Sequence, residues 1–121
     1  YGFLRRVFEV FEKYRTPIDM VTTSEVAVSL TIDSDQYLTE ILEELRQFGS
    51  VEVDADQTIV SVVGQGIAKE NGVLQQLFKA IGDIPVRMVS HGGSPHNISL
   101  LVAADRKKEL LQQLNRGLFG L

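Results

Sequence analysis

The side chains of residues 18–26, which read Ile-Asp-Met-Val-Thr-Thr-Ser-Glu-Val, could bind a cation. Asp19 and Glu25 are acids, and the residues between them include three hydroxyl side chains, Thr22, Thr23 and Ser24. A carboxylate that binds an ammonium group makes a charge-assisted hydrogen bond, which contributes about 1.5–3 kcal/mol. Hydroxyl side chains also satisfy backbone groups in turns, so an ordinary solvated hairpin is the competing interpretation. These residues alone leave both interpretations open.

The rest of the chain offers little catalytic chemistry. His91 and His96 lie five residues apart without a third ligand, so they are predicted to be hairpin residues rather than a metal pair. Asp54 and Asp56 lie in a predicted turn. Acid–base catalysis by two carboxylates requires different pKa values, and no apolar enclosure is predicted there that would separate them. Gly64-Gln65-Gly66 lacks the GK[ST] ending of a phosphate loop. The segment is therefore predicted to be non-catalytic, without a metal or cofactor of its own.

The composition excludes several classes of function. The 121 residues include no cysteine, so the chain can form neither disulfides nor thiolate metal sites. The formal net charge of −4 argues against a nucleic-acid surface, which needs a basic face. No apolar run approaches the ~20 residues of a membrane span and no signal peptide is recognised, so no membrane contact and a cytoplasmic location are expected. Because the chain opens with Tyr1 rather than Met and its first residues already resemble a helix, we expect it to be a segment of a longer protein.

The same order of predicted helices and strands occurs twice along the chain, which indicates an internal duplication. Each copy reads helix, strand, strand, helix, with one extra strand on each side of residue 55. The recurring pairs are 2–11 with 72–81 (offset 70), 18–22 with 86–90 (offset 68), and 26–30 with 98–102 (offset 72).

Apolar spacing predicts the helices, and alternation predicts the strands. The helices are predicted at 3–15, 37–48, 72–81 and from Asp105 onward. The strands are predicted at 17–22, 26–32, 51–53, 57–63, 86–90 and 98–102. The first helix is expected to bury Leu4, Val7, Phe8, Phe11 and Tyr14, and the last helix Leu110, Leu111, Leu114 and Leu118.

Residues at the helix ends carry further expectations. Oxygen-bearing side chains before the helix at 37–48 could cap its start: Asp33, Ser34 and Asp35. Gly49, just past the end of that helix, is expected in the left-handed conformation. Gly2 corresponds to Gly72 in the second copy, so the two glycines are expected to share a backbone role.

The order of elements predicts an α+β fold of two ferredoxin-like units, each with an antiparallel sheet and helices on one face. The predicted domains are 1–55 and 56–121. A complete unit reads βαββαβ, so the first copy lacks its opening strand and the second its closing strand. An open sheet edge recruits partners, and we therefore expect dimerisation or strand swapping.

Three runs resemble the C-terminal regulatory region of aspartate kinase, a tandem of amino-acid-binding ACT domains. They are GFLRRVFEVFEKYRTPIDMVTTSEVAVSLTID, VEVDADQTIVSVVG and VRMVSHGGSPHNISLLV. The resemblance covers essentially the whole chain and is closest to lysine-inhibited members with a single catalytic function. It implies an upstream kinase domain that uses ATP and Mg²⁺, which is not part of this segment.

The resemblance also implies an L-lysine site in the first copy, near a homodimer contact. The effector carboxylate is expected on the backbone N–H groups of Gly2, Phe3 and Leu4, and the ammonium on Asp19 beside the backbone of Pro17 and Ile18. The family places changes that relieve feedback inhibition in the following stretch, here Thr22, Thr23, Ser24 and Glu25. Pro17 departs from the family, which usually has a small polar residue at that position.

The second copy serves as an internal control for this assignment. Arg87 stands at the position of Asp19 and would repel an ammonium group. Only the first copy is therefore expected to bind a cationic amino acid. The alternatives are a site for threonine, or for lysine and threonine together, and a module that serves only dimerisation. An RNA-binding sheet is disfavoured because the predicted strands at 26–32, 86–90 and 98–102 lack aromatic residues.

Overall fold

The structure is a computed structural model that describes residues 2–24 and 27–121. It divides into two compact units, unit 1 (Tyr1–Val53) and unit 2 (Asp54–Leu121). Among the described residues, no helix is long and apolar enough to cross a bilayer.

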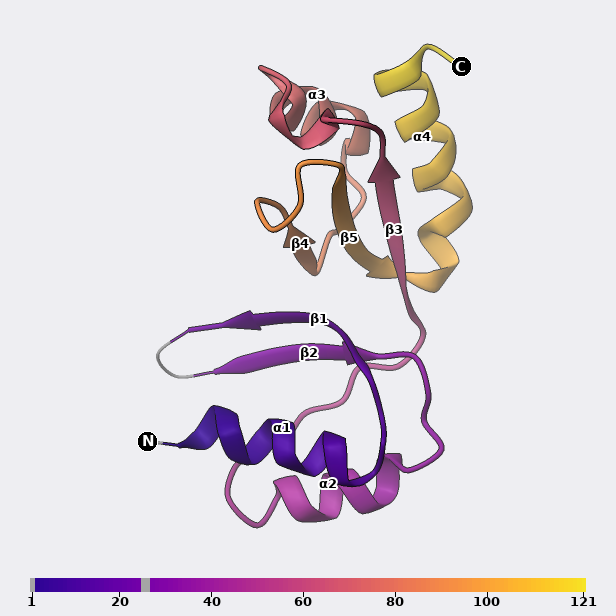
Figure 1. The fold of residues 1–121 in the computed structure, drawn as a ribbon. Helices are drawn as coiled ribbons and strands as arrows, with labels where there is room; N and C mark the ends of the chain where they lie inside the picture. Colours follow the sequence, from indigo (N-terminus) through magenta and orange to yellow (C-terminus); the bar gives the residue numbers. More distant parts are fainter. Residues whose placement is uncertain (1, 25–26) are drawn as a thin grey trace. The chain divides into compact units, whose positions relative to one another are not determined.

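Unit 1 is a β-hairpin with two helices on one side of it (Figure 1). The elements follow in the order α1 (Phe3–Lys13), β1 (Ile18–Thr23), β2 (Val28–Ile32) and α2 (Leu38–Leu45). The strands β1 and β2 pair antiparallel, with a register irregularity between Ile18 and Val21. This order of helix, strand, strand and helix confirms the prediction for the first copy.

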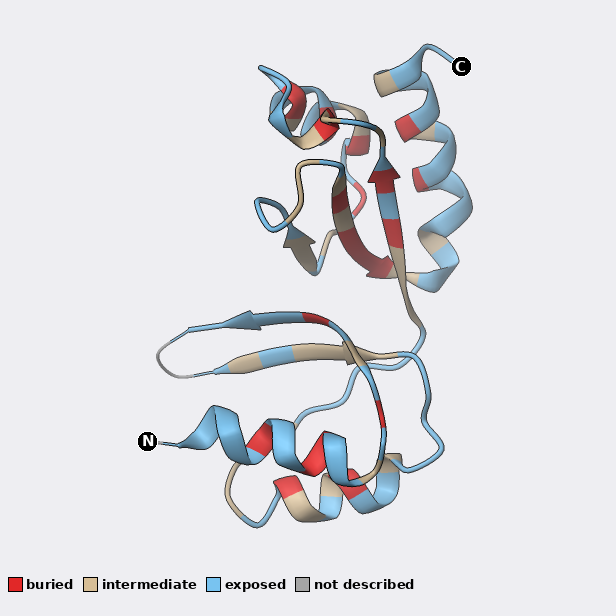
Figure 2. Ribbon diagram, in the orientation of Figure 1, coloured by how far each residue is buried: buried red, intermediate tan, exposed pale blue. Residues whose placement is uncertain are grey.

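The core of unit 1 lies between the helices and the hairpin (Figure 2). Its buried members are Val7, Val10, Phe11, Ile41 and Leu45. The predicted stripe of α1 was partly wrong, because Leu4 (40%) and Phe8 (41%) are exposed and Val10 is buried instead. At about 100° per residue, Leu4 and Phe8 lie on the flank of the face centred on Val7.

Unit 2 is a three-stranded antiparallel sheet covered by two helices. Its elements are β3 (Gln57–Val63), η1 (Ile67–Lys69), α3 (Val73–Ile81), β4 (Met88–Ser90), β5 (Asn97–Ala103), η2 (Ala104–Arg106) and α4 (Lys107–Phe119). The strand order is β3-β5-β4, which is the order expected for the first three strands of a ferredoxin-like unit. The predicted fold class, α+β with antiparallel sheets and helices on one face, is confirmed.

Alternation along the strands builds the core of unit 2. Even-numbered residues of β3 and β5 point toward the helices, among them Val60, Ile98 and Leu100. On α4, Leu110 and Leu114 are buried against them and Leu118 is partly buried. Leu111 was expected to be buried but is 40% exposed. It is adjacent in sequence to Leu110, about 100° around the helix, and therefore lies outside the buried face.

Two predictions for the segment after α2 were wrong. Residues 51–53 form no strand: Val51 packs on the core of unit 1, and Val53 is exposed. Gly49 does not have the positive φ of a left-handed cap. The chain leaves α2 through a turn in which the Phe48 N–H donates to the Leu45 carbonyl oxygen. A Cβ on Gly49 would lie 3.3 Å from the Phe3 ring, so close packing accounts for a glycine at this position.

The predicted side-chain cap of α2 was also wrong. Tyr37 is the N-cap residue, and it makes no side-chain capping bond. Instead, Ser34 Oγ accepts from the Gln36 N–H at 3.3 Å, and the Asp35 carbonyl accepts from the Leu38 N–H at 3.1 Å. Residues 35–38 therefore form a turn that leads into the helix.

Gly117 marks a close approach of α4 to α3. A Cβ on Gly117 would lie 2.5 Å from the Cβ of Ala80. We expect Gly117→Ala to lower the free energy of unfolding by about 1–2 kcal/mol, since the strain of overpacking exceeds the gain in helix propensity. Urea denaturation measures the change. The double variant Ala80→Gly/Gly117→Ala removes the clash and should regain most of the loss; a double variant less stable than Gly117→Ala would exclude this contact as the cause.

Candidate functional site

The start of α1 presents free backbone donors. Gly2 caps the helix in the left-handed conformation (φ 73°, ψ 7°), and its carbonyl accepts from the Arg6 N–H at 3.1 Å. The N–H groups of Phe3, Leu4 and Arg5 precede this first bond and have no acceptor within the helix. No acidic side chain lies in the first turn. The arrangement is suited to a carboxylate, because the positive end of the helix dipole lies at the same place.

Gly72 begins α3 in the same way, with φ 77° and ψ 5°, and its carbonyl accepts from the Gln76 N–H at 3.0 Å. The shared backbone role expected for Gly2 and Gly72 is therefore confirmed. A residue with a Cβ rarely adopts such positive φ values.

Two aromatic contacts anchor the start of α1 on the segment after α2. The Phe3 ring meets the Phe48 ring edge to face, with centroids 5.8 Å apart. The Arg6 guanidinium lies over the same Phe48 ring, with its Cζ 4.0 Å from the centroid. The sequence pattern does not indicate this stack of Arg6 on Phe48, because the contact depends on how α1 and α2 pack.

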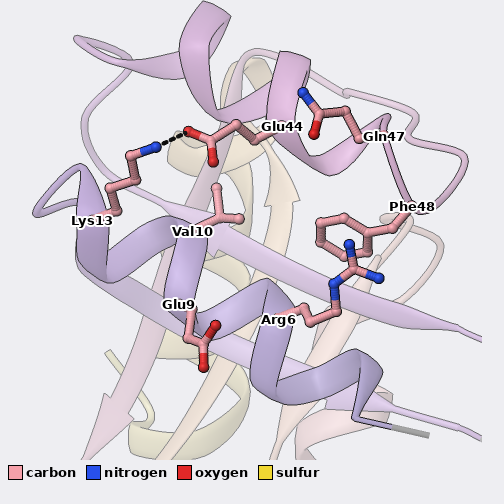
Figure 3. Close-up of a pocket in the computed structure, with 7 residues that line it drawn as sticks. All are labelled: Arg6, Glu9, Val10, Lys13, Glu44, Gln47 and Phe48. Carbon is pink, nitrogen blue, oxygen red and sulfur yellow. Dashed lines mark hydrogen bonds and ion pairs between the residues drawn. The ribbon is translucent and has the colours of Figure 1, made fainter.

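A groove of about 240 Å³ runs between α1 and α2 (Figure 3). At one end Lys13 Nζ lies 2.9 Å from Glu44 Oε2, and the Tyr14 hydroxyl donates to the same carboxylate. At the other end is the Arg6–Phe48 stack. On the groove wall Glu9 pairs with Arg5 at 3.2 Å. Because these charges are already engaged, we assign the groove a structural role.

The contacts of Glu44 predict a pH dependence of stability. Hydrogen bonds from Tyr14 and then Lys13 hold the pKa of Glu44 below its ordinary value of 4.5. A carboxyl with a lowered folded-state pKa stabilises the fold above its ordinary pKa, and this stabilisation is lost as the pH falls through the folded-state value. We expect Glu44→Gln to lower the unfolding temperature at pH 7, and the difference from wild type to shrink as the pH falls below about 4.

Thermal unfolding at pH 7 and at lower pH tests this expectation. Glu43→Gln is the matched control, because Glu43 is an exposed residue of α2 with no ion pair among the residues that the structure describes. A deficit of Glu44→Gln that stays constant with pH would contradict the assigned role of the carboxylate.

Asp19 lies on β1 with an exposed side chain. Within residues 2–24 and 27–121, no side chain forms an ion pair or hydrogen bond with its carboxylate. Pro17 precedes the strand and Ile18 begins it, packed against the core of unit 1. At the corresponding position of unit 2, Arg87 Nη2 pairs with Asp54 Oδ2 at 2.6 Å.

The hydroxyl residues after Asp19 belong mainly to the strand. Thr22 pairs with Ser29 and Thr23 with Val28, so both lie in the ladder of β1 and β2 rather than in a loop. The Ser24 N–H donates to the Ala27 carbonyl at 2.9 Å and closes the hairpin. Glu25, the last predicted site residue, lies outside the described residues.

One chain does not bring the two halves of the predicted site together. The strand β1 begins beside the end of α1 and runs back toward its start (Figure 1). Asp19 is the second residue of β1, whereas Gly2, Phe3 and Leu4 begin a helix about 16 Å long. A lysine molecule, with four methylene groups before its ammonium, is too short to reach from one end of this helix to the other.

The two predicted hairpin histidines each make a backbone contact in unit 2. His96 Nδ1 accepts from the Gly66 N–H at 2.9 Å, and His91 Nε2 lies 3.2 Å from the Ala68 carbonyl oxygen. These contacts join the loop at 91–96 to residues 64–69. Both side chains therefore have a structural role in the loops.

Comparison with known proteins identifies the family. The ACT domain profile matches residues 60–118. A C-terminal regulatory domain of aspartate kinase from Porphyromonas gingivalis W83 is 46% identical, with a TM-score of 0.87 over 98% of this chain and 81% of that one. This chain belongs to the aspartate kinase family. It is a regulatory ACT region of such an enzyme, as the resemblance of its sequence predicted.

A further relative of this regulatory region comes from Escherichia coli and matches in both sequence and structure. Lysine-sensitive aspartokinase 3 is 33% identical over 126 residues, which cover 98% of this chain and 28% of the enzyme. The crystal structure of E. coli aspartokinase III in complex with lysine and aspartate (T-state) matches with a TM-score of 0.83 and 33% identity, over 98% of this chain and 28% of that one. The chain therefore spans little more than a quarter of that enzyme.

Proposed function

We propose that this chain is the region through which an aspartate kinase senses L-lysine, and that lysine bound at unit 1 inhibits the ATP-dependent phosphorylation of aspartate. The proposal is supported by the E. coli relative, which is named lysine-sensitive and whose T-state structure contains lysine. The two ACT copies predicted at 1–55 and 56–121 would then have different roles. The first would bind the effector, and the second would have a structural role.

The observation that carries the proposal is the contrast between Asp19 and Arg87. The carboxylate of Asp19 is exposed and has no partner in the described part of the chain. Its counterpart in unit 2 is a cation that is already paired with Asp54. A positively charged ligand therefore finds an acceptor in unit 1 and a repelling group in unit 2, as expected for a lysine site in only one copy.

The distance between the two halves of the site within one chain supports an effector site that is shared by two subunits of a homodimer. In that arrangement the start of α1 in one subunit of a homodimer would hold the carboxylate of lysine, with the backbone N–H groups of Phe3 and Leu4 as donors. Asp19 in the other subunit would hold the ammonium, beside the backbone of Pro17 and Ile18. Thr22 and Thr23 are the last residues of β1, the strand that runs back toward the start of α1, and they would lie at the carboxylate end of the site. Lysine binding and homodimer formation would then stabilise each other.

Inhibition would follow from a population shift. Lysine can favour the inhibited enzyme only through a higher affinity for the dimer arrangement found in that state. The catalytic domain, which would supply the ATP and Mg²⁺ chemistry, would respond to that arrangement. This segment contributes binding energy and no reacting group.

Calorimetric titration of the purified chain with L-lysine, L-threonine and L-methionine tests the proposal, with the dimer state measured by sedimentation in the same buffers. Saturable heat with lysine alone, and a stronger dimer in its presence, is the expected result. Saturable heat with threonine alone would replace lysine by the alternative effector. A stable dimer that binds none of the three would favour a module that serves only association.

A further inference from the structure

The register of the hairpin in unit 1 changes at Asp19. Ile18 pairs with Ile32 and Val21 pairs with Leu30. Two residues of β1, Asp19 and Met20, therefore lie opposite the single residue Thr31 of β2. This is a β-bulge, a feature that bends a strand and changes the direction of its side chains.

The side chain of Thr31 completes the hydrogen bonding of this bulge. Thr31 Oγ1 accepts from the Met20 N–H at 3.0 Å. Leu30 and Ile32, on either side of it, pack against the core of unit 1, so Thr31 points to the opposite face of the hairpin. A backbone donor that loses its ladder partner is costly to leave unpaired, and the hydroxyl removes that cost.

The bulge also decides which face the following residues occupy. Directly opposed residues share a face, so Val21 and Thr23 lie on the face of Leu30 and Val28, while Thr22 lies with Ser29 on the other. Without the extra residue, every side chain after Asp19 would change faces. The bulge therefore sets the direction of Asp19 and of both threonines together.

In unit 2 the strand pairing of β4 begins at Met88, the residue after Arg87. Met88, Val89 and Ser90 pair in unbroken register with Leu101, Leu100 and Ser99. The Arg87 N–H donates directly to the Leu101 carbonyl at 2.8 Å, without a side-chain acceptor. The residue opposite this place is Thr31 in the copy that carries the aspartate and Leu101 in the copy that carries the arginine, so only the first copy has a hydroxyl acceptor there.

We propose that Thr31 is a positioning residue of the effector site: its hydroxyl holds the bulge that directs the Asp19 carboxylate toward the ligand ammonium. The proposal rests on the proposed lysine function. It assigns Thr31 no contact with the ligand. It requires that loss of the hydroxyl change the recognition of the ammonium more than the stability of the fold.

Titration of wild type, Thr31→Val and Thr31→Ser with L-lysine tests the role of Thr31. Valine keeps the shape of threonine but removes the acceptor, and serine keeps the acceptor. We expect Thr31→Val to weaken lysine binding by about tenfold, the effect of one misaligned charge-assisted hydrogen bond. Thr31→Ser should stay within about threefold of wild type. L-norleucine lacks only the side-chain ammonium of lysine, so it should bind wild type and Thr31→Val with equal affinity.

The outcomes separate this proposal from the proposed function. A wild-type chain that does not bind lysine would overturn both. If wild type binds lysine and Thr31→Val binds it equally well, the positioning role is wrong and the lysine site stands. Equal weakening of lysine and norleucine would also overturn it, since that pattern indicates general damage to the hairpin. Thr31→Ala, a second variant without the hydroxyl, decides in the same way if Thr31→Val does not fold.

Discussion

Replacing Asp19 with asparagine is expected to weaken L-lysine binding by about 10- to 100-fold. Asparagine has nearly the same size, so the exchange removes the charge and leaves the shape of β1 intact. The carboxylate has no competing partner in the described part of the chain, and its whole interaction with an ammonium group would be lost. Calorimetric titration measures the change.

Two controls make this expectation specific. L-norleucine should bind wild type and Asp19→Asn with the same affinity, because it has no ammonium at the end of its side chain. Asp54→Asn removes another exposed carboxylate and frees Arg87 in unit 2, and it should leave lysine binding unchanged. If Asp19→Asn weakens both ligands equally, Asp19 does not recognise the ammonium.

The order of elements could be predicted from the sequence because helix and strand periodicities are local properties. The stretch 72–81 was predicted to be a helix, and α3 covers nearly all of it. Residues 51–53 were predicted wrongly because a strand requires a partner strand, and the alternation of two valines does not supply one. Gly49 was misjudged for a similar reason, since its contact with Phe3 depends on packing rather than on the end of the helix.

For the site, the sequence identified the residue types but not their arrangement. It marked Asp19 and the helix start at Gly2, whose charges are complementary to an amino acid. It did not indicate that β1 runs back along α1 and separates them, because direction and distance are tertiary properties. It also missed Thr31, whose importance comes from a register shift of one residue. The only local indication was the hydroxyl residue Thr31 itself, in the predicted strand 26–32 that pairs with β1.

Two neighbouring leucines of α4 differ in burial, since Leu110 is buried and Leu111 is exposed. Leu110→Ala should lower the free energy of unfolding of unit 2 by about 2–5 kcal/mol, because Leu110 is 0% exposed and its removal leaves a cavity among packed side chains. For a unit of this size, each 1 kcal/mol corresponds to about 4–8 °C in the unfolding temperature. Calorimetric and urea unfolding measure the loss.

Leu111→Ala is the matched control, with the same exchange one residue further along the same helix. Leu111 is 40% exposed, so its truncation should change the free energy of unfolding by less than about 1 kcal/mol. The periodic pattern alone placed both leucines inside, and the structure separates them by about 100° around the helix. Similar losses in the two variants would mean that α4 is rotated relative to the described packing. A large loss for Leu110→Ala alone would support the helix face on which the core of unit 2 is built.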